Sequence, residues 1–360
     1  MEKKKLAFVV ALLVCILSVF TMMTIFDPSG TVFVTPVSGQ FSSNVYLKMK
    51  ELAQVPWSRD RRLDPCKDCP DNLKFVNSLT ELRGNISRTF NLRNSLAVYK
   101  SHINPEKMTF RQNFWTAGEA PKGIYKDYYE DNFYTMKSQK TCALVGSSGI
   151  LSQSKCGREI DSHDFVMRVN LPVVRGYEED VGKRTNLTAV NNLSMSFLST
   201  YLDKRNKMVR KNRRYLTALR SMGDGVLWIP YNMSARAYLM SEAKSKFKNI
   251  LSKTIDGADY SYRVAYAPVP VWPQLINSFW NKTGTSEGFV MLTIATLFCR
   301  EITLYGFWPF PKDRHGYYVS HHYYENIRYK KRKTTMSTEF GILQDLNRRG
   351  VIRLITEKCA

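Results

Sequence analysis

Three polar segments of the 360-residue chain each follow a short hydrophobic run that is typical of a buried strand. They are the turn Gly146-Ser147-Ser148-Gly149, Asn170 and Asn191. The turn resembles a phosphate-binding loop, but it matches neither G-x-x-x-x-G-K-[ST] nor G-x-G-x-x-G. Each segment alone is a common turn whose polar groups satisfy the local backbone. Three in succession favour a ligand cleft, because the carboxyl ends of parallel strands meet at one edge of a sheet.

Two later segments contain groups that could act on an anion. Ser286 stands where it can cap a helix from about Glu287, and the exposed amides of a helix N-terminus favour negative charge. The segment "VSHHYYEN", Val319–Asn326, holds His321 and His322, two of only five histidines. A pair among tyrosines favours function, although a single histidine is more often structural. We expect no metal, because the two are adjacent and no H-x-x-x-H or D-x-D pattern is present.

These segments need strands and helices to position them, and the sequence supplies both. The strand-like runs are Cys142–Val145, Phe165–Val169, Leu187–Val190, Val226–Ile229, Val264–Ala267 and Ile302–Phe307. Helical patterns lie between several of them, notably at residues 234–253 and 288–300. The alternation predicts an α/β fold with a Rossmann-like, mostly parallel, doubly wound sheet flanked by helices. The last run leads into Trp308-Pro309-Phe310, an aromatic surface that suits either a sugar or base, or packing in the core.

The first 26 residues indicate the compartment. Lys3, Lys4 and Lys5 precede the uncharged run Leu6–Phe26, which is long enough to cross a bilayer with the lysines in the cytoplasm. A cleaved signal peptide would have a shorter apolar region and a small-residue cleavage site, which "TIFDPSG" does not offer. The expected organisation is a cytoplasmic tail at 1–5, a transmembrane signal anchor at 6–26, a lumenal stem at 27–95 and a lumenal domain at 96–360.

Sequons, cysteines and charge agree with a lumenal position. The five N-x-[ST] sequons, which predict glycosylation, are Asn85, Asn186, Asn192, Asn232 and Asn281. Of seven cysteines, Cys15 lies in the expected span, and the even number that remain favours disulfides whose connectivity the sequence leaves open. For Cys66-Lys-Asp-Cys69, a local disulfide is favoured over a redox or zinc motif. The formal charge of +22 would suggest nucleic acid in a cytosolic protein. Here it favours a solvated basic face or attraction to anionic glycans.

Together the motifs resemble those of the animal sialyltransferases, most closely the α2,8 branch. "CALVGSSGILSQSKCGREIDSHDFVMRVNLP" is similar to the large motif of that family, "SEGFVMLTIATLFCREITLYGFWPF" to the small motif and "HHYYEN" to the third. "TTMSTEF", Thr334–Phe340, lies where the last motif falls, and the likeness covers roughly residues 139–359. The resemblance implies a Golgi membrane enzyme of type II topology. It would transfer sialic acid from CMP-sialic acid to a sialylated glycoprotein or glycolipid, with inversion and without a metal or other cofactor.

The resemblance also implies roles for individual residues. Those that would contact the donor are Gly146, Ser147, Ser148, Gly149, Asn170, Asn191, Ser286, Glu287, Gly288, Trp308 and His321. His322 matches the histidine that stabilises the leaving phosphate, a task that suits a protonated imidazole. The family's two clamping disulfides would be Cys142–Cys299 and Cys156–Cys359.

Three positions depart from the family pattern. Ser147 replaces the asparagine of the donor turn, and Glu287 replaces the threonine of the small motif, which puts a carboxylate where anionic groups would dock. Thr334 stands where the last motif has its expected base histidine, five positions before the glutamate. A threonine cannot act as a base near neutral pH.

Two interpretations follow from these departures. In the first, the protein is a working sialyltransferase whose base is dispensable or has been replaced, with His321, His315 and Glu339 as the candidate substitutes. In the second, it is a catalytically impaired or inactive relative that binds sialylated glycans or a partner enzyme. A third function, binding of polyanions, rests on the charge alone.

Overall fold

The computed structural model describes the residues that build the predicted domain. They are 76–89, 103–104, 109–112, 115–119, 138–191, 194, 213–229, 254–255, 258–259, 261–266, 276–277, 279–281, 284–328 and 334–359, all within the unit Pro56–Ala360. Among these residues no helix has the length and hydropathy needed to cross a membrane. The predicted signal anchor at 6–26 lies outside them, as does the predicted helix at 234–253.

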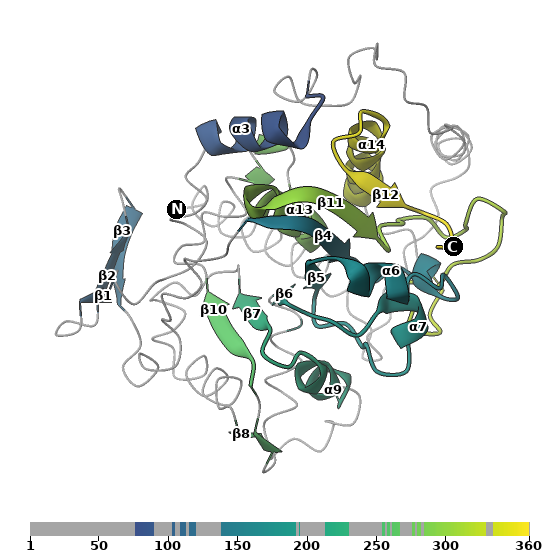
Figure 1. Cartoon of the computed structure of the whole chain (residues 1–360), viewed down its shortest axis with the longest axis horizontal. Coiled ribbons are helices and arrows are strands. Elements are labelled where there is room, and N and C mark those ends of the chain that lie inside the picture. The colour runs from purple at the N-terminus through teal and green to yellow at the C-terminus, as the bar shows by residue number, and fades with distance from the viewer. Residues whose placement is uncertain are drawn as a thin grey trace, which may run out of the picture. The chain divides into compact units, whose positions relative to one another are not determined.

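Seven parallel strands form the central sheet, in the order β10-β7-β6-β5-β4-β11-β12 (Figure 1). Their bounds are β4 Gln139–Val145, β5 Phe165–Val169, β6 Leu187–Ala189, β7 Val226–Ile229, β10 Arg263–Tyr266, β11 Cys299–Tyr305 and β12 Arg353–Ile355. The six predicted runs all form strands of this sheet, and β12 is an addition.

The order of the strands reverses between β4 and β11. From β4 the chain adds β5, β6, β7 and β10 on one side, and it then returns to place β11 against the other side of β4. The register pairs Val145 with Tyr305, so the two strands end together. In open parallel sheets the crevice outside the carboxyl ends at such a reversal is where ligands bind.

Alternate residues of the strands pack on opposite faces of the sheet. Leu144 and Met167 belong to one hydrophobic cluster, whereas their neighbours Ala143 and Val166 belong to another. This alternation follows from the period of two in a strand, and burial on both faces explains why the strands are hydrophobic throughout.

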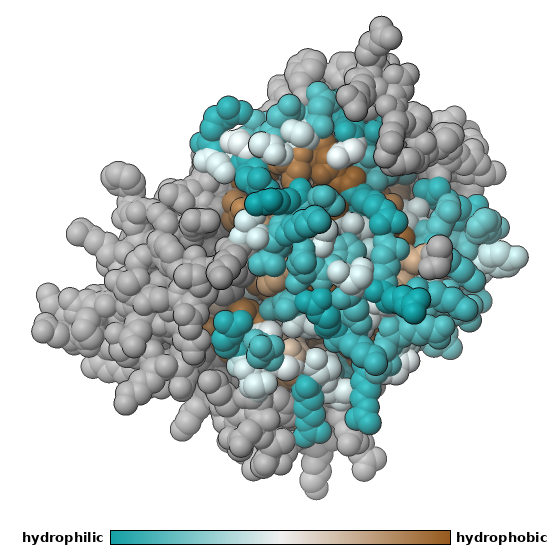
Figure 2. Space-filling view, viewed as in Figure 1, coloured by the Kyte–Doolittle hydropathy of each residue, from teal (hydrophilic) through white to brown (hydrophobic). Residues whose placement is uncertain are grey.

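Helices cover both faces of the sheet (Figure 1). The first cluster includes residues of α3 (Leu79–Thr89), α13 (Glu287–Phe298) and α14 (Thr334–Arg348), and the second includes residues of α6 (Gly157–Ser162) and α7 (Glu178–Val181). The remaining elements are β1 Ile103–Asn104, β2 Thr109–Gln112, β3 Trp115–Glu119, η4 Gly149–Leu151, α9 Arg213–Ser221, β8 Thr254–Ile255 and β9 Ala258–Asp259. On the face drawn in Figure 2 the described surface is mostly hydrophilic, with apolar residues visible in small areas between polar ones.

Helix α3 is part of the core, although it lies in the range 27–95 that we assigned to the stem. Leu82 and Ile86 are completely buried in the cluster that contains α13. Arg83 donates hydrogen bonds of 2.5 Å to the carbonyl oxygens of Thr296 and Cys299, at the end of α13. The folded domain therefore begins before residue 96.

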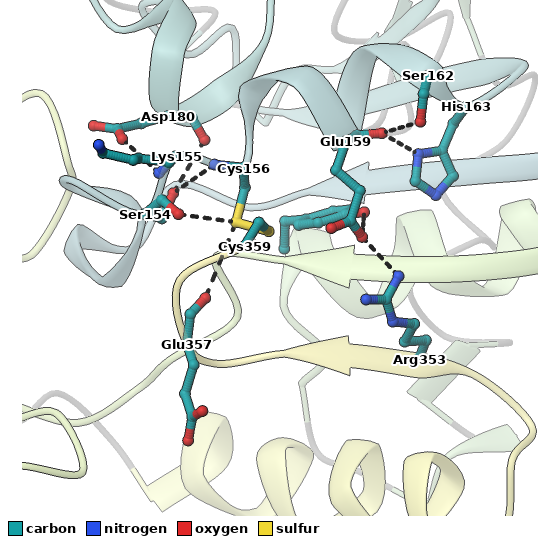
Figure 3. Close-up of a disulfide and its surroundings, with 11 residues drawn as sticks. Ser154, Lys155, Cys156, Glu159, Ser162, His163, Asp180, Arg353, Glu357 and Cys359 are labelled. Carbon is teal, nitrogen blue, oxygen red and sulfur yellow. Dashed lines mark hydrogen bonds and ion pairs between the residues drawn. A yellow bond between two sulfur atoms is a disulfide. The ribbon is translucent and has the colours of Figure 1, made fainter.

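Two disulfides tie distant parts of the domain together, and they are the pairs that the resemblance implies. Cys142 of β4 is bonded to Cys299 at the start of β11, 157 residues later. Cys156, which precedes α6, is bonded to Cys359. Figure 3 shows this second bond next to Ser154. The carbonyl oxygen of Ser154 accepts from the amide of Cys359.

Candidate functional site

A cavity of about 420 Å³ opens beyond the carboxyl ends of β4, β5, β6 and β11. Helix α13 contributes its N-terminal residues to the wall, and α14 contributes Met336, Glu339, Phe340 and Leu343. The lining includes all but one of the residues predicted to act on the donor: Gly146, Ser147, Ser148, Asn170, Asn191, Ser286, Glu287, Gly288, Trp308, His321 and His322. The sequence therefore locates the cavity, because its motifs converge there.

Glycines let the two central strand ends approach each other. A Cβ on Gly146 would lie 2.6 Å from the carbonyl oxygen of Gly306, and Gly306 has a φ of +72° that favours glycine. Ser148 fixes this arrangement, because its amide donates to Gly306 (3.2 Å) and its hydroxyl donates to the carbonyl oxygen of Trp308 (2.9 Å). Its hydroxyl is thus occupied in joining the two strand ends.

Gly149 does not line the cavity, unlike the other three residues of the turn. Its amide donates to the carbonyl oxygen of Ser320, and a Cβ there would lie 2.2 Å from the Ser320 hydroxyl. Gly149 is needed for close packing between the turn and the segment that carries the histidines. Ser147 connects to the same segment, since its carbonyl accepts from Tyr323 and its side chain contacts Tyr324.

Asn170 and Asn191 are joined to each other. Asn170 has a φ of +63°, which asparagine tolerates better than most residues, and its side-chain oxygen accepts from the Asn191 amide at 3.0 Å. The side-chain oxygen of Asn191 in turn accepts from the amide of Ser194 at 2.8 Å. Because both oxygens hold backbone groups, the amino groups of the two side chains are the parts that can donate to a ligand.

The N-terminus of α13 is held in a defined position. The hydroxyl of Ser286 caps the helix by accepting from the Phe289 amide, and the amide of Ser286 donates to Oε1 of Glu339 at 2.6 Å. Glu339 is 3% exposed, so this carboxylate positions the helix rather than standing ready as a base. Glu287, the first residue of the helix, is buried in the cavity wall.

The histidine pair forms a compact polar cluster with Glu325. Nδ1 of His322 lies 2.7 Å from Oε2 of Glu325, and Nδ1 of His321 lies 3.3 Å from Nδ1 of His322. The ring of His322 also stacks on Tyr324 at a centroid distance of 5.1 Å. With Nδ1 engaged by the carboxylate, Nε2 is the nitrogen of His322 that can reach a ligand.

Arg214 of α9 pairs with the other oxygen of Glu325. Burial opposes ionisation of Glu325, but the hydrogen bonds with His322 and Arg214 outweigh it, so the pKa of Glu325 lies below its ordinary value. Burial also lowers the pKa of Arg214, yet hydrogen bonds to Tyr215 and Glu325 leave that pKa raised. The cluster thus contains a fixed carboxylate beside the histidines and a fixed cation behind it.

His315 and Trp308, which the sequence suggests as a base and as a donor contact, are placed differently from that expectation. His315 lies exposed in the turn where Asp313 accepts from the amides of His315 and Tyr317, and it does not line the cavity. Trp308 lines the cavity but is 4% exposed, and it packs edge-to-face on Phe340 at 5.3 Å. The aromatic surface after β11 therefore serves mainly for packing.

Three sequons fall within the described residues. Asn85 lies on α3, and Asn281 is exposed. The side-chain oxygen of Asn186 accepts from the Val166 amide at 2.8 Å, between β5 and β6. Asn192 and Asn232 lie outside the described part of the chain, so glycosylation at all five sites stays a prediction.

The parallel sheet, with its cavity at the reversal of strand order, places the protein among the doubly wound α/β proteins that bind ligands at this point. Within that class, the chain belongs to glycosyltransferase family 29, the sialyltransferases, whose family model matches residues 88–351.

Individual relatives agree with this family. Over 326 residues the chain is 28% identical to alpha-2,8-sialyltransferase 8E of Rattus norvegicus, covering 87% of this chain and 81% of the relative. It is 31% identical over 272 residues to alpha-N-acetylneuraminide alpha-2,8-sialyltransferase of Xenopus tropicalis, covering 69% and 71%. A crystal structure of a mammalian sialyltransferase in complex with Gal-β-1-3GalNAc-ortho-nitrophenol superposes with a TM-score of 0.45 at 16% identity. That superposition covers 81% of this chain and 99% of the other, and the family assignment does not depend on it.

Proposed function

We propose that the protein transfers sialic acid from CMP-sialic acid to a sialylated glycan in α2,8 linkage, with inversion and without a required metal. The observation that carries the proposal is the cavity itself. It joins the turn after β4, the amide groups of two asparagines, the N-terminus of α13 and the histidine cluster around one volume of about 420 Å³. Anion-directed donors from separate elements are what a nucleotide-sugar donor requires.

Departure of CMP is the step that this arrangement supports best. As the bond to sialic acid breaks, negative charge develops on the phosphate of the leaving nucleotide. A protonated His322, held through Nδ1 by Glu325, can donate from Nε2 to that phosphate. Arg214 keeps the Glu325 carboxylate in place from the opposite side. The three residues thus form a relay in which only the imidazole meets the substrate.

Activation of the acceptor hydroxyl requires a base other than Thr334. Of the candidates, His315 does not line the cavity, and Glu339 accepts the Ser286 amide in a buried position. His321 lines the cavity, and its side chain is 32% exposed. We therefore assign the role of base to His321, which would lie beside His322 on the acceptor side.

The expected cellular setting fits this chemistry. Long-range disulfides such as Cys142–Cys299 form in oxidising compartments, and a type II anchor would place the domain in the Golgi lumen. The other partners that we propose are the Golgi membrane and a sialylated glycoprotein or glycolipid.

A second function, binding without transfer, is favoured by one specific observation. Glu287 places a buried carboxylate in the wall of the cavity, beside the helix N-terminus that would otherwise favour an anion. Together with Thr334 at the position of the expected base, this describes a relative that binds a glycan or a partner enzyme and has lost turnover.

A transfer assay separates the two functions. The purified full-length protein is incubated in EDTA with CMP-sialic acid and a sialylated oligosaccharide, and the product is analysed by mass spectrometry and NMR. We expect a slowly formed α2,8-linked product that is lost in His322→Gln and kept in the control His315→Gln. The absence of both transfer and donor hydrolysis, while CMP binds, would favour the binding function instead.

A further inference from the structure

The segment that follows the cavity strand brings three metal-ligating side chains together. Within the described residues, donor atoms of His321, His322 and Glu325 lie within 4.8 Å of one another. Two imidazoles and one carboxylate are the protein ligands of one common type of zinc site, in which the fourth position stays open. The cluster is not covered over, because the side chains of the two histidines are 32% and 26% exposed and both line the cavity.

The separations between the donor atoms fit one small cation. Ligands at 2.0–2.1 Å from a tetrahedral zinc lie about 3.3–3.4 Å from each other. The corresponding edges here are 3.3 Å between the two Nδ1 atoms, and 2.7 Å and 4.0 Å from these atoms to Oε2 of Glu325. The required value lies between these edges, and the shortest and longest of them each differ from it by about 0.6–0.7 Å, a change that rotation of the two rings and of the carboxylate can supply.

The surroundings of the cluster also suit a metal. Arg214 pairs with Oε1 of Glu325, which leaves Oε2 directed toward the two histidines. Such a contact to the second oxygen of a ligating carboxylate is a common way of fixing its orientation.

We propose that His321, His322 and Glu325 bind a divalent transition metal of the zinc type, and that the bound metal inhibits transfer. Inhibition follows because a metal on Nδ1 of His322 would replace the hydrogen bond to Glu325, so the imidazole could no longer take the protonated form that donates to the leaving phosphate. The open position would face the cavity, where the donor competes for the same space. The inhibitory part rests on the proposed function, whereas the metal site does not.

Metal binding is measured first, without reference to activity. The full-length protein is stripped of metal with a chelator, and Zn²⁺ is titrated calorimetrically, with Co²⁺ absorption as a second reading of coordination. We expect one site per chain, with affinity lowered by about 100-fold or more in His321→Gln and in Glu325→Gln. His315→Gln removes an exposed histidine outside the cluster and should bind as the wild type does.

Both His321→Gln and Glu325→Gln are tested, so that one remains informative if the other folds poorly. Thermal unfolding without metal identifies a variant that folds poorly. Equal zinc affinity in the wild type, His321→Gln and Glu325→Gln would overturn the site. Transfer is then assayed with increasing Zn²⁺ at fixed donor. Loss of rate in parallel with site occupancy supports inhibition, and an unchanged rate at full occupancy refutes it. If the wild type transfers nothing, the proposed function fails, whereas the calorimetric result still decides the metal site.

Discussion

Replacement of Glu287 by glutamine should make the cavity bind CMP more tightly. Glu287 is 7% exposed and belongs to the wall of the cavity that we assign to the donor. Glutamine has nearly the same shape, so the substitution removes a negative charge without opening a hole. The helix N-terminus beside it favours an anion in both proteins, and that contribution cancels in the comparison.

The size of the effect follows from the volume of the cavity. A sphere of about 420 Å³ has a radius just under 5 Å, so an anion at its centre lies roughly 5 Å from a carboxylate in the wall, and one at the far side roughly 9 Å. At an effective dielectric constant of about 20, two unit charges at these distances repel by about 3 and about 2 kcal/mol. Removal of the repulsion should tighten CMP binding by about 30- to 150-fold.

Calorimetric titration of CMP into the wild type and Glu287→Gln at one ionic strength measures this difference. Glu301→Gln is the matched control, because Glu301 is exposed on β11, away from the carboxyl end of that strand. The control should bind as the wild type does. An affinity in Glu287→Gln that is unchanged or lower would show that the carboxylate does not repel the ligand, and the reasoning on charge would then be wrong.

The remaining predictions concern the histidine relay, the missing base and a disulfide. Glu325→Gln should lower kcat by about 10- to 100-fold with little change in CMP affinity, because the substitution removes a charge-assisted hydrogen bond to His322. Steady-state kinetics measures kcat and calorimetry measures the affinity, and equal losses in both quantities would contradict the prediction. Because the folded pKa of Glu325 lies below its ordinary 4.5, its stabilising contribution is present above that pH and is lost as the pH falls through the folded value. Glu325→Gln should therefore flatten the acid limb of the unfolding free energy, and an unchanged limb in denaturant titrations would rule this out. Thr334→His should leave the rate of product formation nearly unchanged, because His321 already serves as the base, and a rise of about 100-fold would show that a base is what the protein lacks. Replacement of Cys142 and Cys299 by serine should cost about 2–5 kcal/mol of unfolding free energy, and denaturant unfolding that matches the wild type would refute a stabilising role.

The strands of the sheet could be predicted because each is a hydrophobic run bounded by turn residues. Burial on both faces demands such runs, and β4 and β5 show them clearly in the sequence. The hydrophobic runs do not predict which strands lie next to each other in the sheet. Cys142 and Cys299 are 157 residues apart, and only the family resemblance suggests that β4 and β11 lie side by side.

The members of the site that lie in motifs could also be predicted, whereas their partners could not. Arg214 ends a basic run, and nothing local distinguishes it from the other cations there. Its role depends on the pairing of α9 with Glu325, 111 residues later. Glu325 could have been predicted as a member of the site, because it lies three residues after His322 in a segment that the sequence already singles out.

Local reasoning also misplaced two features, for the same physical cause. Glu339 stands within a motif and can be proposed as a base, but its carboxylate is committed to the Ser286 amide, 53 positions earlier. Helix α3 stands in a mixed segment that we expected to be stem, yet it buries Leu82 and Ile86 in the same cluster as α13. In both places tertiary packing decides what the residue or segment does.

The position of bound CMP tests the central claim most directly, and a crystal structure of the protein soaked with CMP would measure it. We expect the nucleotide in the cavity beyond β4 and β11, with a phosphate oxygen within hydrogen-bond distance of Nε2 of His322 and the amino groups of Asn170 and Asn191 turned toward the ligand. CMP bound at another place, or with its phosphate away from His322, would contradict the claim that this cavity is the site of transfer.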